Sequence, residues 1–252
     1  MPSLLLINPN TSAQVTALLR TQVQANAGPH VSVHAVTARF GAPYIACEAS
    51  YAVAPHATLD AWASVIAHAV DRSARPSAVL IGCFGDPGLL ALRDTSRAPV
   101  TGLAEGSFVE AGQHGRFAVV TGGARWEPML RRLAQTLGCA DALAWIETVA
   151  PTGAQLAADP EAARTLLADS CRRALARSDA RSVIVGGAGL AGFAADLQRV
   201  VDAPLVDSVQ AGARYALALA RGGAAATLGE DRFDVVWQGL AAEMSTLDAS
   251  RE

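Results

Sequence analysis

The chain of 252 residues has no lysine, and all 20 of its basic residues are arginine. Without lysine it cannot hold pyridoxal phosphate or an aldol intermediate as a Schiff base. It also cannot form a Walker A phosphate loop, which needs its lysine. The formal net charge of -3 argues against a nucleic-acid partner. The composition therefore excludes chemistry on a Schiff-base lysine and nucleotide binding by a Walker A loop.

Cysteine and histidine are also scarce. The four cysteines, Cys47, Cys83, Cys139 and Cys171, are far apart and form no C-x-x-C pair, and the five histidines form no H-E-x-x-H motif. This pattern is typical of reduced thiols and gives no argument for a metal site. No apolar run reaches ~18 residues, and residues 1–8 lack a basic leader, so we expect a cytoplasmic protein with no membrane span.

Aromatic residues make up only 5% of the chain, whereas hydrophobic residues make up 51% and alanine accounts for 54 positions. This apolar content is ample for a folded core whose helices pack through small side chains. At ~150 residues per domain, the length fits one large domain or two small ones.

Short apolar runs alternate with longer amphipathic stretches along the whole chain. Buried runs that are followed by helices indicate parallel sheets in an α/β fold. The predicted strands are residues 4–7, 31–36, 78–82, 99–101, 117–121, 143–146, 182–186 and 205–206.

A weak internal repeat runs through these strands. Residues 4–10 match 117–123, residues 78–85 match 182–189, and residues 98–100 match 203–205, with offsets of 113, 104 and 105. We therefore predict two pseudo-symmetric, Rossmann-like α/β domains with mainly parallel sheets and an active site in the cleft between them. The predicted first domain is residues 1–101 plus 208–252, and the second is residues 102–207. The returning segment is expected to hold helices at about 208–220 and 231–247.

Cys83 is the main candidate for chemistry because it directly follows a predicted buried strand. Asp86 and Pro87 come next, and aspartate favours the N-cap of a helix while proline favours its first position. A helix beginning there would stabilise a thiolate at Cys83. Gly85 would allow a ligand to approach the backbone closely. The alternative is a buried structural cysteine.

Other strand ends supply candidate binding residues. Asn10, or Thr11, can cap the helix that follows the first strand, or the Asn10 amide can hold a carboxylate or carbonyl oxygen. In the second half, the stretch Thr121-Gly122-Gly123 is the counterpart of Asn8-Pro9-Asn10. The turn that contains Pro43 and Tyr44 follows another strand and can line the same cleft.

The segment 187–192 fits the G-x-G-x-x-G pattern, with Asp207 following at the distance of a ribose-binding acid. This leaves open an NAD(P)-binding protein. The internal repeat explains the same glycines without a nucleotide, because Gly187 is the counterpart of Cys83.

Three segments together resemble the aspartate/glutamate/hydantoin racemase family, in its hydantoin and allantoin racemase branch. They are Asn-Pro-Asn-Thr-Ser at 8–12, Cys-Phe-Gly-Asp-Pro-Gly-Leu at 83–89 and Gly-Gly-Ala-Gly-Leu-Ala-Gly at 186–192; Gly-Leu-Ala-Glu-Gly at 102–106 is similar too. The resemblance runs from residue 5 to residue 212. It implies two facing halves, chemistry without a cofactor, and two cysteines on opposite sides of the substrate Cα. Homo-oligomers are common in the family.

In this resemblance Cys83 is the retained acid/base, and the second cysteine maps onto Gly187. The proton donor for the second face then has to come from Cys47, Tyr44 or an ordered water. The implied substrate-binding residues are Asn10, Pro43, Tyr44, Phe84, Gly85, Thr121, Gly122, Gly186, Gly187 and Ala188.

The sequence thus predicts a cofactor-independent racemase that acts on a carbon next to a carbonyl in a hydantoin-, allantoin- or amino-acid-like substrate, with Cys83 as acid/base. The alternatives are a decarboxylase or cis-trans isomerase that uses Cys83 alone, an NAD(P)-binding protein, and a non-catalytic small-molecule binder.

Overall fold

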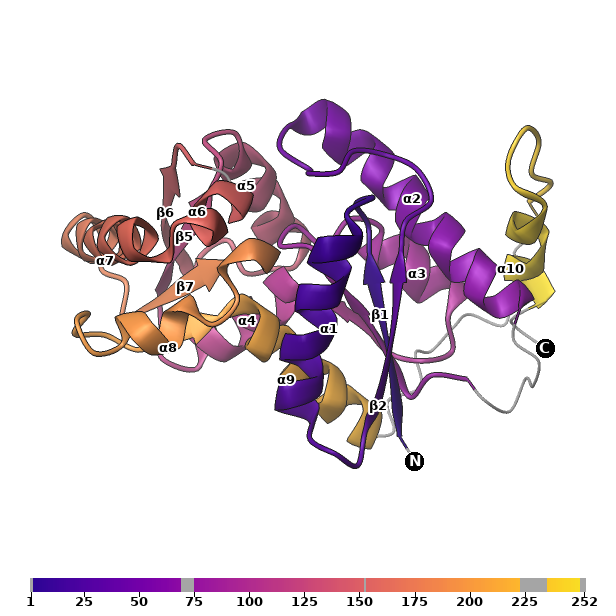
Figure 1. Cartoon of the computed structure of the whole chain (residues 1–252), viewed down its shortest axis with the longest axis horizontal. Helices are drawn as coiled ribbons and strands as arrows, with labels where there is room; N and C mark the ends of the chain where they lie inside the picture. The colour runs from indigo at the N-terminus through magenta and orange to yellow at the C-terminus, as the bar shows by residue number, and fades with distance from the viewer. Residues whose placement is uncertain (1, 69–74, 152, 223–234, 250–252) are drawn as a thin grey trace.

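A computed structural model describes residues 2–68, 75–151, 153–222 and 235–249. Figure 1 shows two sheets side by side, each flanked by helices. The predicted class is confirmed: both sheets are parallel, and their strands lie in the eight places that the apolar runs indicate.

The first sheet is built from the N-terminal part of the chain. Its strand order is β2-β1-β3-β4, which is the order of a sheet wound outward in both directions from its first strand. The strands are β1 (Ser3–Asn8), β2 (Ser32–Thr37), β3 (Ala78–Ile81) and β4 (Val100–Gly102). The helices of this part are α1 (Ala13–Ala27), α2 (Glu48–Ala67), α3 (Leu89–Thr95) and α4 (Leu103–Gly112).

The second sheet repeats this arrangement in the order β6-β5-β7-β8. The strands are β5 (Phe117–Gly122), β6 (Leu143–Val149), β7 (Ser182–Gly186) and β8 (Leu205–Asp207). The helical elements are α5 (Trp126–Thr136), α6 (Gly153–Ala158), α7 (Pro160–Ala176), the 3-10 turn η2 (Ala188–Leu190), α8 (Phe193–Leu197) and α9 (Ser208–Arg221).

The two sheets also share their register. Ile7 pairs with Ile81 in the first sheet, and Val120 pairs with Val185 in the second, in agreement with the sequence offsets of 113 and 104. The repeat is therefore a structural one. It makes Thr121 the counterpart of Asn8 and Gly187 the counterpart of Cys83.

Helices α4 and α9 follow the last strand of each sheet and pack against each other between the two halves (Figure 1). Both helices contact β7 and β8 of the second sheet, and α9 also lies against α1 and β3 of the first. Gly106 of α4 faces Gly212 of α9, which lets the helix backbones come close together. Phe108 of α4 stacks on Phe117 of β5, with ring centroids 5.3 Å apart. This helix pair joins the cores of the two halves.

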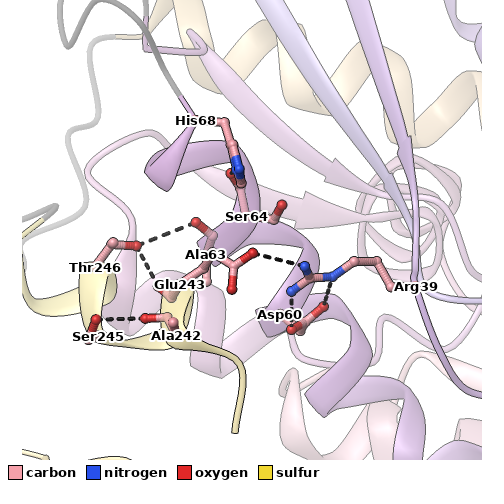
Figure 2. Close-up of polar contacts among 9 residues, drawn as sticks. All are labelled: Arg39, Asp60, Ala63, Ser64, His68, Ala242, Glu243, Ser245 and Thr246. Carbon is pink, nitrogen blue, oxygen red and sulfur yellow. Dashed lines mark hydrogen bonds and ion pairs between the residues drawn. The ribbon is translucent and has the colours of Figure 1, made fainter.

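The C-terminal segment packs on α2 and is anchored by charge (Figure 2). Arg39 contacts the buried carboxylate of Asp60 through two nitrogens, at 2.9 and 2.7 Å, and reaches Glu243 at 2.9 Å. Glu243 lies in the 3-10 turn η3 (Ala242–Ser245), which leads into α10 (Thr246–Ala249).

The helix that we expected at 231–247 is wrong over residues 235–241, which are not helical; residues 231–234 lie outside the described part. Gly239 has a φ of 70°, a left-handed conformation that interrupts a right-handed helix. The expected helix at 208–220 is confirmed as α9. None of the helices in the described ranges is long and apolar enough to cross a membrane.

Candidate active site

A cavity of about 280 Å³ lies between the two halves, at the carboxyl ends of strands from both sheets. Segments that follow β1, β2, β3, β5 and β7 all contribute to its wall, as expected for facing open α/β sheets. The lining residues are Asn10, Ser12, Gln14, Val15, Leu18, Pro43, Tyr44, Ile45, Gly82, Cys83, Phe84, Thr121, Gly122, Trp126, Gly186, Gly187, Ala188, Gly189 and Leu190. Among these residues there is no charged side chain.

Cys83 lies in this wall two residues after β3, with only 8% of its surface exposed. Burial raises the pKa of its thiol well above the ordinary value, and the nearby carboxylate of Asp86 raises it further. Both effects act against the thiolate that the sequence predicts at Cys83. Helix α3 begins at Leu89 after an N-cap at Gly88, which is later in the chain than the Asp86–Pro87 start that the sequence predicts. Burial thus favours the neutral thiol, which can give a proton directly and can take one only after it has ionised.

The sequence predicts that Asp86 caps the helix that follows it, α3, but in the structure its side chain caps a different helix. Its carboxylate accepts hydrogen bonds from the backbone N–H groups of Ala104 at 2.9 Å and Glu105 at 2.8 Å, and so caps α4. The left-handed φ of 48° at Asp86 turns the side chain toward that helix. A Cβ at Gly102 would overlap the carboxylate. Burial raises the pKa of Asp86 to about 7, against the lowering effect of its two N–H partners.

The side-chain amide of Asn10 lines the cavity, and hydrogen bonds to its oxygen fix its orientation. Its Oδ1 accepts from the side chain of Asn8 at 2.9 Å and from the backbone N–H of Ser12 at 2.9 Å. In the described part of the chain its Nδ2 has no protein partner, and it opens on the cavity. The side chain can therefore donate a hydrogen bond to a bound oxygen. The expected helix cap at Asn10 or Thr11 is wrong, because the Ser12 hydroxyl caps α1 by accepting from Val15.

The opposite wall comes from the second half and is made of backbone and small groups. Thr121, Gly122, Gly186, Gly187 and Ala188 all line the cavity there. A Cβ at Gly186 would overlap the ring of Phe84, which crosses from the first half. The Tyr44 hydroxyl donates to the carbonyl of Gly122 at 3.3 Å and so ties the Pro43–Tyr44 turn to the second half.

Gly85 is the one predicted binding residue that does not line the cavity. A Cβ there would come within 2.6 Å of the Trp126 ring, and its carbonyl accepts from the Tyr51 hydroxyl at 2.7 Å. Trp126 itself lines the cavity and was missed by sequence reasoning, as were Val15, Leu18, Ile45 and Leu190. The sequence does contain a signal for Trp126, because this residue follows shortly after the end of β5 at Gly122.

The other candidate residues lie outside this cavity. Cys47 is the N-cap of α2, where hydrogen bonds from the backbone and side chain of Ser50 lower the pKa of its thiol. Cys171 is buried among the second-half core residues. In the described ranges no three His, Cys, Asp or Glu side chains gather as a metal site would require.

The Gly-rich segment after β7 is occupied by backbone contacts. The Asp207 carboxylate accepts from the N–H groups of Gly192 at 2.6 Å, Val209 at 2.9 Å and Gln210 at 3.0 Å. It serves as the N-cap of α9 and is not free to bind a ribose. The observations do not favour the nucleotide-binding alternative.

Comparison with known proteins places the fold and the site in context. A family model described as Asp/Glu/hydantoin racemase matches residues 4–216. A hydantoin racemase of Pseudomonas sp. (strain NS671) is 30% identical over 215 residues, covering 83% of this chain and 82% of the relative. One from Paenarthrobacter aurescens is 29% identical over 221 residues, covering 86% and 90%. The solved structure of an allantoin racemase from Klebsiella pneumoniae superposes with a TM-score of 0.83 at 26% identity, covering 98% of this chain and 99% of the other.

Proposed function

The chain belongs to the Asp/Glu/hydantoin racemase family and is an isomerase of the racemase type; from this premise we propose that it inverts the carbon next to a carbonyl in a neutral hydantoin-type ring. The observation that supports this is the pairing of a buried thiol, Cys83, with the free amide of Asn10 in one uncharged cavity. Cys83 is the acid/base for one face of that carbon.

The substrate class follows from the wall of the cavity. A free dicarboxylic amino acid would bring carboxylates into a space whose described lining has no arginine or other cation to balance them. A hydantoin ring is neutral and offers carbonyl oxygens to a donor such as Asn10. The side chains of Leu18, Ile45 and Trp126 form an apolar surface for a ring substituent. Hydantoins with an apolar substituent at the reacting carbon therefore fit better than allantoin, whose substituent is a polar urea.

The proposed chemistry at the first face needs two groups. When Cys83 is a thiolate it takes the proton from the ring carbon, and the electron pair moves toward the neighbouring carbonyl oxygen. Asn10 donates a hydrogen bond to that oxygen and stabilises the enolate. In the opposite direction the Cys83 thiol returns a proton to the same face. The low polarity of the cavity strengthens the hydrogen bond from Asn10 as charge develops.

The test is inversion of single enantiomers. Enantiopure 5-benzyl- and 5-isopropylhydantoin, allantoin and aspartate are each incubated with the protein, and chiral chromatography follows loss of the starting enantiomer. We expect inversion of the two hydantoins to be fastest, and to fall by on the order of 10²-fold or more in Cys83→Ala. Cys139→Ala is the matched control, because that cysteine lies outside the cavity. Inversion that survives Cys83→Ala, or that is confined to aspartate, refutes the proposal.

A further inference from the structure

The second face of the substrate meets a wall that carries no thiol. The shared register of the two sheets puts Gly187 at the place that Cys83 holds in the first half, and Thr121 at the place of Asn8. Both Gly187 and Thr121 line the cavity. A racemase must nevertheless deliver a proton to this face, since inversion requires removal on one side and return on the other.

Gly187 leaves room beside this wall. A Cβ built there meets nothing nearer than Leu190 Cγ at 3.7 Å and Thr121 Oγ1 at 3.9 Å, which is ordinary van der Waals contact. At the neighbouring Gly186, by contrast, the Phe84 ring already fills the space. A CH₂–SH group is larger than one water, whose share of liquid volume is about 30 Å³, so the place where that side chain would lie can hold a water.

The polar group nearest to the space beside Gly187 is the hydroxyl of Thr121. The residue is only 3% exposed, and within the described ranges its hydroxyl has no hydrogen-bond partner. The Thr121 oxygen is also accessible. Among the described residues the one fully enclosed side-chain polar atom without a hydrogen-bond partner is Trp62 Nε1, so the unpaired Thr121 Oγ1 is not fully enclosed. In contrast, Asn8, the counterpart of Thr121 in the first half, donates hydrogen bonds from its side-chain Nδ2 to Asn10, Ser12 and Thr16. A buried hydroxyl that opens only on a cavity indicates a partner that comes from the cavity.

We propose that Thr121 is a positioning residue that holds a water molecule beside Gly187, and that this water exchanges the proton on the substrate face opposite Cys83. The inference rests on the proposed racemase function and assigns its second face. It replaces a second thiol with a solvent-derived group, and Thr121 fixes that group by accepting from it or donating to it.

The proton balance closes in both directions. In one direction the Cys83 thiolate takes the ring-carbon proton, and the water gives a proton to the opposite face as its O–H bond breaks. The hydroxide so formed takes the proton from the Cys83 thiol through solvent and restores the starting state. In the other direction hydroxide beside Thr121 removes the proton as water forms, and the Cys83 thiol returns one to its own face. No oxidant, reductant or cofactor is needed.

The test measures proton removal at each face separately, with substrates that lose fluoride once the ring-carbon proton has been removed. Each enantiomer of 5-(fluoromethyl)hydantoin loses fluoride when the ring-carbon proton is taken, because the electron pair forms a C=C bond and the C–F bond breaks. Elimination thus needs only one face, whereas inversion needs both. Fluoride release, measured with an ion-selective electrode against an enzyme-free control, reports each face by itself.

We expect a crossed pattern. Thr121→Val should lower fluoride release from one enantiomer by on the order of 10–100-fold and leave the other nearly unchanged, while Cys83→Ala does the reverse. Inversion of 5-benzylhydantoin should fall in both variants. Thr121→Ser, which keeps the hydroxyl, should retain most of the inversion rate. Thr148→Val is the matched control, since Thr148 pairs with Thr121 on the neighbouring strand but does not line the cavity.

Three outcomes overturn the inference in distinguishable ways. If Thr121→Val lowers fluoride release from both enantiomers equally, Thr121 has a structural role only. If Thr121→Val keeps full inversion while Cys83→Ala loses it, the racemase proposal stands and the role of Thr121 is refuted. If the unaltered protein inverts no hydantoin, both proposals fall. Melting temperatures of all variants check that each one folds.

Discussion

The close approach of α4 and α9 gives a sharp stability prediction. A Cβ at Gly106 would lie 2.7 Å from Gly212 Cα and 3.0 Å from the Ala211 carbonyl oxygen. Both neighbours are backbone atoms of α9, so neither can rotate away as a side chain would. Gly106→Ala therefore has to push the two helices apart, and with them the cores of the two halves.

The magnitude comes from two opposing effects. Overpacking of a tight core contact costs about 1–3 kcal/mol, whereas alanine in place of glycine inside a helix gains about 0.5–1 kcal/mol. The net loss lies between about 0 and 2.5 kcal/mol, and because both clashing atoms belong to backbone we expect Gly106→Ala to lower the free energy of unfolding by about 1–2 kcal/mol. At about 2–4 °C per kcal/mol for a chain of this size, the melting temperature should fall by several degrees.

Gly112→Ala is the matched control in the same helix. A Cβ at Gly112 has no neighbour within 4 Å, so this variant receives the helical gain without the clash. Urea denaturation of the two variants beside the parent protein gives the comparison. The reasoning is refuted if Gly106→Ala is as stable as Gly112→Ala, because the helices could then not be in the contact that the structure shows.

Three further predictions concern charge. Because burial raises the pKa of Cys83 above its usual 9.0, turnover on a hydantoin should keep rising by about tenfold per pH unit up to pH 9, and a plateau below that value would contradict it. Asp86 holds its proton to about pH 7 when folded but releases it near 3.8 when unfolded, so its contribution to stability is lost as pH rises through that window. In Asp86→Asn the corresponding slope of unfolding free energy against pH should disappear. Arg39→Ala should lower stability by about 1–3 kcal/mol, because the buried carboxylate of Asp60 loses two charged donors, whereas Glu243→Ala should lower it by under about 1 kcal/mol; equal losses in urea titrations would show that the Asp60 pair contributes nothing special.

The framework was predictable because its signals are local. Strands buried on both faces read as continuous apolar runs, so Leu4–Ile7 and Phe117–Val120 stand out in the sequence. Parallel strands bring their carboxyl ends to one edge, which is why residues picked at strand ends, such as Asn10, Cys83 and Thr121, share one cavity.

The rest depends on contacts that are distant in sequence. Asp86 caps a helix 18 residues further on, and no local rule distinguishes that partner from the nearer helix. The pKa of the Cys83 thiol is raised chiefly by burial, which depends on the folded structure and is not visible in the composition. Trp126, at the start of α5 in the second half, lines the cavity and lies against Tyr51 and Gly85 of the first half, contacts that follow from the packing of the two halves. The C-terminal expectation was wrong because Gly239 interrupts a stretch that is otherwise apolar enough for a helix.

The two halves solve the same capping problem in opposite ways, and the difference bears on the chemistry. Both α4 and α9 begin directly after an edge strand and need an acceptor at their first N–H groups. In the second half Asp207, at the N-cap itself, supplies it. In the first half the N-cap is Gly102, and the carboxylate arrives from Asp86 in the Cys83 loop.

The loop that carries the thiol is therefore fastened to a helix end by its own buried carboxylate. The capping contact holds the Cys83 loop against α4. Burial raises the pKa of Cys83, and the negative charge of Asp86 in the same loop raises it further. At the matching loop of the second half the carboxylate belongs to Asp207 at the helix end and accepts from the Gly192 N–H, while residues 187–192 bring no charged side chain of their own. One face of the cavity thus holds a fixed, weakly acidic thiol, and the other holds an uncharged hydroxyl with room beside it, an arrangement suited to two different proton carriers rather than to two equal ones.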